Sequence, residues 1–205
     1  FKGGYQIKSV RDAADKPLKH TVNFTMMRID LPQPLKTGEK YTFKVDWSYN
    51  INDMMKISGR SGMEYFPEDG NYVYIIAQWF PRMCVYDDVV GWQNKQFLGQ
   101  GEFTLAFGNY AVNLTVPADH IVAATGMVQN PNEVLTAEQI ARFEKAKTTF
   151  DKPLKIVTQD EAIAKEKTKV TNKKTWKFYA ENVRDFAFAS SRKFIWDAQA
   201  VKLGS

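Results

Sequence analysis

Apolar and polar residues alternate in several short runs of this 205-residue chain. In the clearest run, intervening Thr, Lys, Asp and Ser separate the apolar residues Tyr41, Phe43, Val45, Trp47 and Tyr49. Successive side chains of a strand point to opposite faces, so this run predicts a strand with one face on a core and the other in water. Strands of this kind are typical of antiparallel sheets. The chain is therefore predicted to be mainly β.

Other runs define further strands and their connections. Residues 103–107 and 112–116 also alternate, and they flank Gly108-Asn109, a pair typical of a tight hairpin turn. Residues 72–77 are mostly apolar and predict a strand that is buried on both faces. At Met26-Met27 the alternation changes phase, which predicts a β-bulge because one extra residue exchanges the two faces.

A different pattern begins near residue 131. Thr136 stands three residues before Gln139, and Thr158 stands three residues before Glu161. In such a capping box the two side chains bond to each other's backbone N–H groups and fix the start of a helix. Two helices are therefore predicted within an insertion between strands. The two helices are predicted over residues 137–147 and 159–167, and the insertion over residues 131–170.

The composition narrows the class of protein. Hydrophobic residues make up 44% of the chain and charged residues 25%, as in ordinary globular domains. No run of about 18 apolar residues is present, so no membrane span is predicted. The single cysteine, Cys84, permits no intramolecular disulfide.

The net charge of +5 is concentrated near the carboxyl end. Residues 151–205 carry 12 Lys and Arg against 7 Asp and Glu, which accounts for the whole excess. Glu161 and Glu166 interrupt this stretch, and no nucleic-acid-binding motif accompanies it. A solvated helix end and loop is the favoured interpretation, and no nucleic-acid partner is expected. The basic residues concerned are Lys165, Lys167, Lys169, Lys173, Lys174 and Lys177.

Sequence motifs for catalysis are missing. The two histidines, His20 and His120, lie far apart and outside any HExxH motif, so the chain does not supply the ligands of a protein zinc site. Both are predicted to be surface or loop histidines. Cys84 has no evident histidine partner. Asp87-Asp88 before Val-Val-Gly91 is typical of a turn rather than of an acid/base pair. No catalytic residue and no metal ligand is therefore predicted.

Five segments together resemble a known family. They are residues 27–38, residues 62–66, residues 77–87 with Ala77-Gln78, Arg82 and Asp87, the segment VPADHIVAATG at 116–126, and residues 183–189. This set resembles the N-terminal domain of the aminopeptidase N family of zinc metallopeptidases. The resemblance implies an antiparallel saddle-like β-sandwich over residues 1–195 with a two-helix insertion. Residues 196–205 are then the start of a linker to a catalytic domain that is missing from this chain.

The resemblance also implies a non-catalytic function. Such a domain packs on the catalytic domain of the same polypeptide, which holds the zinc, and lines the cleft for peptide substrates. Gln78 is then a substrate-binding residue, because an amide both donates and accepts hydrogen bonds; a cap for a strand end is the alternative. Arg82 is expected to brace the loop by pairing with Asp87 or Asp88. Many members have Glu where this chain has Phe80, so recognition of the substrate's amino group falls to the catalytic domain.

Two further expectations concern location and an alternative function. The chain has no signal peptide, which predicts an internal fragment, and the resemblance implies a periplasmic or secreted bacterial protein. The alternative is a stand-alone β-sandwich module that binds carbohydrate or protein. Trp79, Tyr86 and Trp92 lie in one loop and are expected to be exposed, either to stack on sugars or to contact an absent domain.

Overall fold

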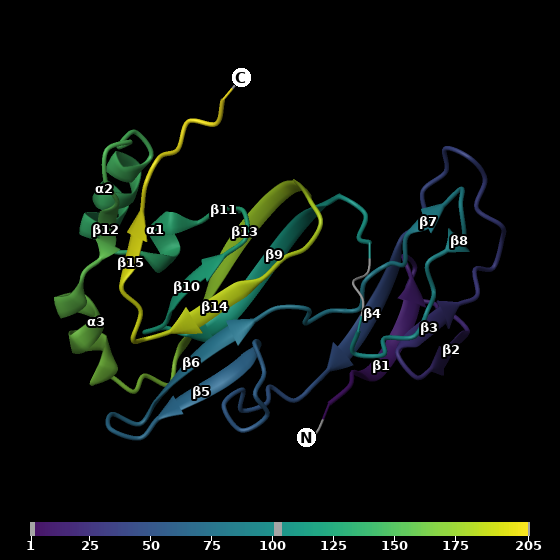
Figure 1. Cartoon of the computed structure of the whole chain (residues 1–205), viewed down its shortest axis with the longest axis horizontal. Coiled ribbons are helices and arrows are strands. Elements are labelled where there is room, and N and C mark those ends of the chain that lie inside the picture. Colours follow the sequence, from purple (N-terminus) through teal and green to yellow (C-terminus); the bar gives the residue numbers. More distant parts are fainter. Residues whose placement is uncertain (1–2, 101–103, 205) are drawn as a thin grey trace. The chain divides into compact units, whose positions relative to one another are not determined.

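The structure is a computed structural model that describes residues 3–100 and 104–204 (Figure 1). It is mainly β, with antiparallel sheets and short helices, so the predicted β-sandwich-like class is confirmed. The chain divides into two compact units, unit 1 with residues 1–52 and 80–106 and unit 2 with residues 53–79 and 107–205. The single domain over residues 1–195 stays a prediction, because two compact units can belong to one folding domain.

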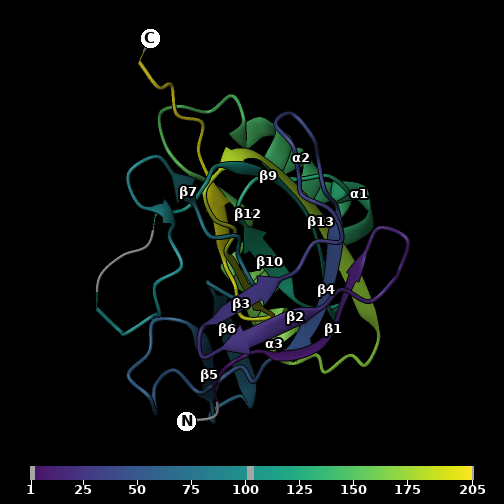
Figure 2. The same ribbon diagram turned by 90° about the vertical axis from the view of Figure 1, so that its right-hand side faces the viewer.

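Unit 1 is built from short antiparallel strand pairs. β1 pairs with β4, β2 with β3, and β7 with β8, and Figure 2 shows β1 and β4 side by side. The strand predicted over residues 41–49 is confirmed as β4, in which Lys44 and Asp46 are exposed and the three apolar side chains are partly buried. The strands of the described part of unit 1 are β1 (Gln6–Asp12), β2 (His20–Asn23), β3 (Met26–Ile29), β4 (Phe43–Ser48), β7 (Tyr86–Asp87) and β8 (Gly91–Trp92).

The phase change at Met26-Met27 marks a hairpin, so the predicted bulge is wrong. Asn23 and Met26 face each other across β2 and β3, and Phe24 and Thr25 form the turn between them. Directly paired residues point to the same face, so a two-residue turn shifts the alternation by one position, as a bulge does. Tight hairpin turns need a positive φ, which Phe24 supplies at 51°. A phenylalanine gives no turn signal in the sequence.

Unit 2 contains the larger sheets (Figure 1). The strand order is β10-β14-β6-β5 in one sheet and β11-β13-β9 in another, and β12 pairs with β15. All of these strand pairs are antiparallel. The elements of its described part are β5 (Gly62–Phe66), β6 (Asn71–Ile76), β9 (Gly108–Pro117), β10 (Ile121–Ala124), β11 (Met127–Val128), α1 (Pro131–Val134), α2 (Ala137–Ala146), β12 (Leu154–Val157), α3 (Gln159–Glu166), β13 (Lys173–Val183), β14 (Phe188–Ser191) and β15 (Trp196–Ala198).

The core of unit 2 includes a row of aromatic rings. Trp176, Phe178 and Ala180 alternate along β13 with exposed residues and are buried. The ring of Phe178 meets the ring of Phe186 edge to face, with 6.3 Å between the centroids. Phe186 precedes β14 and is completely buried. Contacts of this kind add about 0.5–1.5 kcal/mol to the stabilisation from burial alone.

The hairpin predicted at Gly108-Asn109 is wrong. β9 starts at Gly108 and pairs with β13, where Gly108 faces Val183. Residues 104–107 form no strand, and Phe103 lies outside the described residues. Alternation identifies the faces of a strand but not its partner, and β13 lies far from β9 in the sequence.

Both predicted capping boxes are confirmed. Thr136 Oγ1 accepts a hydrogen bond from Gln139 N at 3.3 Å, and Gln139 Oε1 accepts one from Thr136 N at 3.2 Å. Thr158 and Glu161 form the same reciprocal pair, at 3.3 and 2.7 Å. The caps place the starts of α2 and α3 where the sequence predicts them.

The predicted insertion contains a further helix and a strand besides the two predicted helices. α1 and β12 also lie within residues 131–170. β12 pairs with β15, so Trp196–Ala198 form a strand of unit 2, whereas the sequence analysis assigns them to a linker. None of the helices in the described part of the chain has the length and apolar character needed to span a membrane.

Candidate functional site

The end of β6 positions Gln78, the predicted substrate-binding residue. Asn71 and Ile76 are buried and the residues between them are partly buried, but Ile75 is 43% exposed, so the predicted burial of both faces holds for β6 except at Ile75. Gln78 follows two residues after Ile76 and has an exposed side chain. Its φ of 52° lies in the left-handed region, which costs a non-glycine residue about 1–3 kcal/mol. The chain therefore turns sharply out of the sheet at Gln78.

Contacts on both sides fix the backbone at Gln78. Ala77 N donates a hydrogen bond to Ser61 Oγ at 3.0 Å. Trp79 Nε1 donates to the backbone oxygen of Phe186 at 3.0 Å, and the indole packs edge-on against a phenylalanine of β14. Trp79 is therefore partly buried within unit 2, contrary to the expected exposure. These anchors hold the left-handed turn in place.

Asp87 organises a turn in unit 1. Its Oδ1 accepts hydrogen bonds from Val89 N at 3.0 Å and Val90 N at 2.9 Å, and its Oδ2 accepts one from Gln93 Nε2 at 2.6 Å. The bond from Val90 N, followed by the bond from Gln93, holds the pKa of the Asp87 carboxyl below its usual value. The predicted turn is confirmed, and Asp87 braces it.

Arg82 lies before this turn and is partly buried. Among the described residues, the hydrogen-bond partners of the Asp87 carboxylate all come from the hairpin itself, and Arg82 is not one of them. The bracing function of Arg82 stays a prediction. Gln78 belongs to unit 2, whereas Arg82 and Asp87 belong to unit 1.

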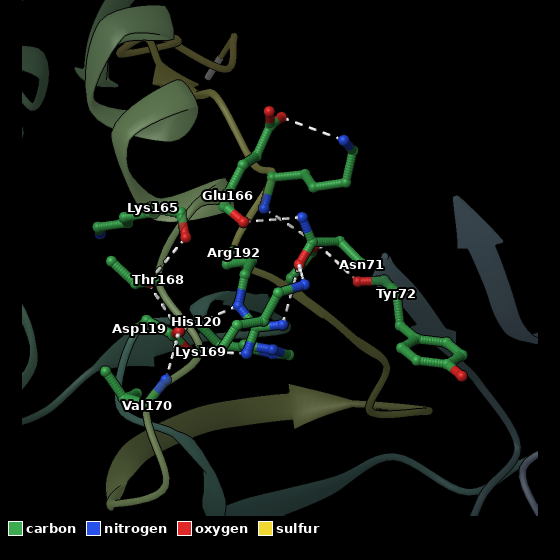
Figure 3. A network of polar contacts seen from close by, with 12 residues as sticks. Asn71, Tyr72, Asp119, His120, Lys165, Glu166, Thr168, Lys169, Val170 and Arg192 are labelled. Atoms are coloured by element: carbon green, nitrogen blue, oxygen red, sulfur yellow. Dashed lines mark hydrogen bonds and ion pairs between the residues drawn. The ribbon is translucent and has the colours of Figure 1, made fainter. Parts of the chain in front are cut away.

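A second group of polar residues lies inside unit 2 (Figure 3). Arg192 donates from Nε to Asp119 Oδ2 at 3.0 Å and from Nη2 to Asp119 Oδ1 at 3.2 Å. Arg192 Nη1 also donates to Asn71 Oδ1 at 3.1 Å, and Asn71 Nδ2 donates to the backbone oxygen of Glu166 at 3.1 Å. These four residues, termed the buried network, join the start of β6, the β9–β10 turn, the end of α3 and the residue after β14.

Asp119 carries its charge in this buried position because several donors surround it. Besides Arg192, Thr168 Oγ1 donates to Asp119 Oδ2 at 2.8 Å. Burial raises the pKa of Asp119, but the hydrogen bonds from Arg192 and Thr168 outweigh burial, so the pKa lies below its ordinary value. Asp119 is therefore a carboxylate at neutral pH, paired with the Arg192 guanidinium.

His120 contacts Ser190 beside the buried network. His120 Nδ1 lies 2.9 Å from Ser190 Oγ, and the two residues are 3% and 2% exposed. His120 lies between β9 and β10, so it is a loop histidine as predicted, but it is buried rather than at the surface, whereas His20 is exposed as expected. Burial, followed by the nearby charge of Arg192, lowers the pKa of His120 to about 4. Its imidazole is neutral at pH 7.

The His120–Ser190 pair does not have the geometry of a catalytic triad. A triad needs a carboxylate that accepts from the imidazole and a serine that a substrate can reach. The carboxylate of Asp119 accepts from Arg192 and Thr168, and Ser190 is closed to solvent. In the described part of the chain, no three His, Cys, Asp or Glu side chains are grouped so that they could hold a metal ion. The arrangement suits a structural role.

The buried network is not among the features predicted from the sequence. Asp119 and His120 directly precede the apolar strand β10, and Arg192 directly follows β14, whose last two residues are buried. Polar residues at the ends of buried strands are a signal for such a network, because a buried polar group needs partners. The sequence alone does not show that these strand ends meet.

No family model, curated protein or solved structure matches this chain.

Proposed function

We propose that this chain is a non-catalytic N-terminal domain of a zinc aminopeptidase or related metallopeptidase. It packs on the catalytic domain of the same polypeptide and lines the cleft that binds peptide substrates. The observation that carries this proposal is the position of Gln78, an exposed amide on a left-handed backbone directly beyond β6. Backbone strain of this kind is found at binding sites, where the surrounding structure maintains it. The contacts of Ala77 and Trp79 supply that support.

The proposal divides binding and chemistry between two domains. The catalytic domain contributes the HExxH motif, and its zinc activates the water that attacks the peptide bond. This chain contributes the Gln78 amide, which donates to and accepts from the polar groups of a peptide. The buried His120–Ser190 pair supports the assignment of a non-catalytic role. A periplasmic or secreted location in a bacterium belongs to the same proposal.

Substitution of Gln78 in the parent enzyme tests the proposal. Gln78→Ala removes a hydrogen bond to the substrate that is worth about 1 kcal/mol, so KM for a peptide is expected to rise about fivefold. The turnover number changes little, because the contact is made in the ground state and the transition state alike. Gln129→Ala is the matched control, since Gln129 is also an exposed glutamine of unit 2. Equal KM values for the two variants would refute a substrate-binding role for Gln78.

The purified 205-residue chain provides a second test. It is expected to contain no stoichiometric zinc and to hydrolyse no peptide. Tight zinc binding or peptidase activity in this chain, measured by metal analysis and a fluorogenic peptide assay, would overturn the division between binding and chemistry.

A further inference from the structure

The β7–β8 hairpin of unit 1 carries two exposed aromatic side chains. Tyr86 and Trp92 face each other across the strand pair, with 5.3 Å between the ring centroids and 75° between the ring planes. Tyr86 is 66% exposed and Trp92 is 54% exposed. Aromatic side chains usually bury most of their surface, so two exposed rings in one short hairpin need an explanation.

The hairpin that carries the rings is held rigidly by its own residues. Three hydrogen bonds to Asp87 fix the turn, and Gln93 N donates to the Val85 backbone oxygen at 2.8 Å beyond the strand pair. Gly91 adopts a φ of 70°, the left-handed position that completes a hairpin of this length. A side chain at residue 91 would also touch the ring of Tyr86. The two rings are thus positioned before any ligand binds, which lowers the entropic cost of binding.

Polar groups suited to hydroxyls lie in the same hairpin segment as the rings. Asp88 and Asn94 are exposed, and within the described residues neither side chain has a hydrogen-bond partner. The Asp88 carboxylate accepts hydrogen bonds, and the Asn94 amide both donates and accepts them. Lys95 follows directly and is also exposed.

We propose that this hairpin, residues 85–95, is a binding site for a neutral pyranose of an oligosaccharide. The C–H groups on one face of a pyranose stack on an aromatic ring, whose negative face attracts them, while the hydroxyls extend sideways to polar groups. Trp92 supplies the stacking surface, and the ring of Tyr86 packs against Trp92 in an edge-to-face contact. Asp88 and Asn94 bind the hydroxyls.

The charge of the hairpin favours a neutral sugar over other ligands with apolar surfaces. Residues 85–95 contain two acidic residues, Asp87 and Asp88, and a single basic residue, Lys95. Single-stranded nucleic acids stack on aromatic rings too, but their sites track the phosphates with several basic side chains. Anionic membranes likewise attract clusters of Lys and Arg. A protein partner would have to supply partners for Asp88 and Asn94, because polar groups buried without hydrogen bonds oppose binding.

This inference does not depend on the proposed peptidase function. The hairpin lies wholly within unit 1, whereas Gln78 lies in unit 2. Binding of sugar by the isolated chain and substrate binding through Gln78 in the parent enzyme are separate measurements. Failure of one leaves the other standing.

Titration of the purified chain with cellohexaose and N-acetylchitohexaose tests the site. We expect the indole N–H signal of Trp92 in a nitrogen-15 NMR spectrum to shift and saturate with at least one of these neutral sugars. The signal of Trp176, which is completely buried, should stay in place. Trp92→Ala should weaken binding by about 5-fold to 150-fold, the loss expected when a ring contact worth about 1–3 kcal/mol is removed. The double variant Asp88→Ala/Asn94→Ala should weaken it severalfold.

Phe24→Asn serves as the matched control because Phe24 is 90% exposed in the other hairpin of unit 1, β2–β3. It should bind sugar as the unchanged chain does. Loss of binding in Phe24→Asn equal to that in Trp92→Ala would show non-specific adhesion and overturn the proposal. Absence of a saturating shift with either sugar at millimolar concentration, or saturation only with heparin or anionic vesicles, would also overturn it.

Discussion

Two aspartates, Asp119 in unit 2 and Asp87 in unit 1, accept several hydrogen bonds each but have different effects on the molecule. Asp119 is buried, and its partner Arg192 is 73 positions away in the sequence. Asp87 bonds to residues no more than six positions away, all in one hairpin. The first aspartate connects separate parts of a sheet system, and the second shapes one turn.

The difference shows how burial decides what a polar cluster can do. In the buried network the carboxylate, the guanidinium and the Asn71 amide bond to one another, away from solvent. In the hairpin, Asp87 accepts hydrogen bonds from the backbone of the turn, while Trp92 and Asp88 stay exposed at the surface. A network closed on itself stabilises the fold, whereas a braced hairpin presents side chains to a ligand.

Removal of each carboxylate tests this contrast and should give the largest effect. Asp119→Ala leaves the Arg192 guanidinium buried without its counter-charge, so the free energy of unfolding should fall by about 3–5 kcal/mol. Asp87→Ala should cost far less, because water can bond to the turn once the carboxylate is removed. Urea unfolding of both variants measures the difference. Equal losses would show that the network does not stabilise unit 2 as described.

The second-largest effect should be a pH dependence of the free energy of unfolding that is caused by His120. The folded chain lowers the pKa of His120 from 6.5 to about 4, so between these values the unfolded chain binds the extra proton. Stability is therefore fully present above pH 6.5 and decreases as the pH falls towards 4, by up to about 3 kcal/mol. His120→Gln keeps a hydrogen-bonding group near Ser190 but does not titrate. Its unfolding free energy should be flatter over this range, and an unchanged slope would assign the effect to other groups.

The β2–β3 hairpin, which lacks a bracing aspartate, should give the smallest effect and one of opposite sign. Phe24 adopts a left-handed φ there, while Gln96 Oε1 accepts from Thr25 N at 2.9 Å. Asn tolerates this conformation better than Phe, so Phe24→Asn should raise the free energy of unfolding by up to about 1 kcal/mol. Phe24→Ala should bring less gain, because Ala lacks the short polar side chain with which Asn bonds locally to the backbone in this conformation. If both variants lower the free energy of unfolding, the ring of Phe24 contributes to the fold.

Local features of the fold could be predicted from the sequence. The alternation at β4 reflects side chains that point to opposite faces, and it depends only on neighbouring residues. The capping boxes at Thr136 and Thr158 span four residues each and fix the helix starts. The turn at Asp87 was equally local. Where one short segment determines the conformation, its sequence pattern is sufficient to predict the local structure.

Features that join distant segments could not be predicted. The partner of β9 is β13, and alternation alone suggested the preceding segment instead. The loop position of His120 follows from the turn residues before it, whereas its burial beside Ser190 depends on β14. For the candidate site, Asp87 followed from its own turn, whereas the role of Gln78 comes from a family resemblance and stays a proposal.

The reading frame of the native gene, together with the mass of its product, decides the functional proposal. If this chain is the cleft-lining domain of a zinc peptidase, the frame continues beyond Ser205 into a domain with an HExxH motif, and the native product is correspondingly larger. A native product that ends near Ser205, with no HExxH domain attached, would rule out the peptidase assignment.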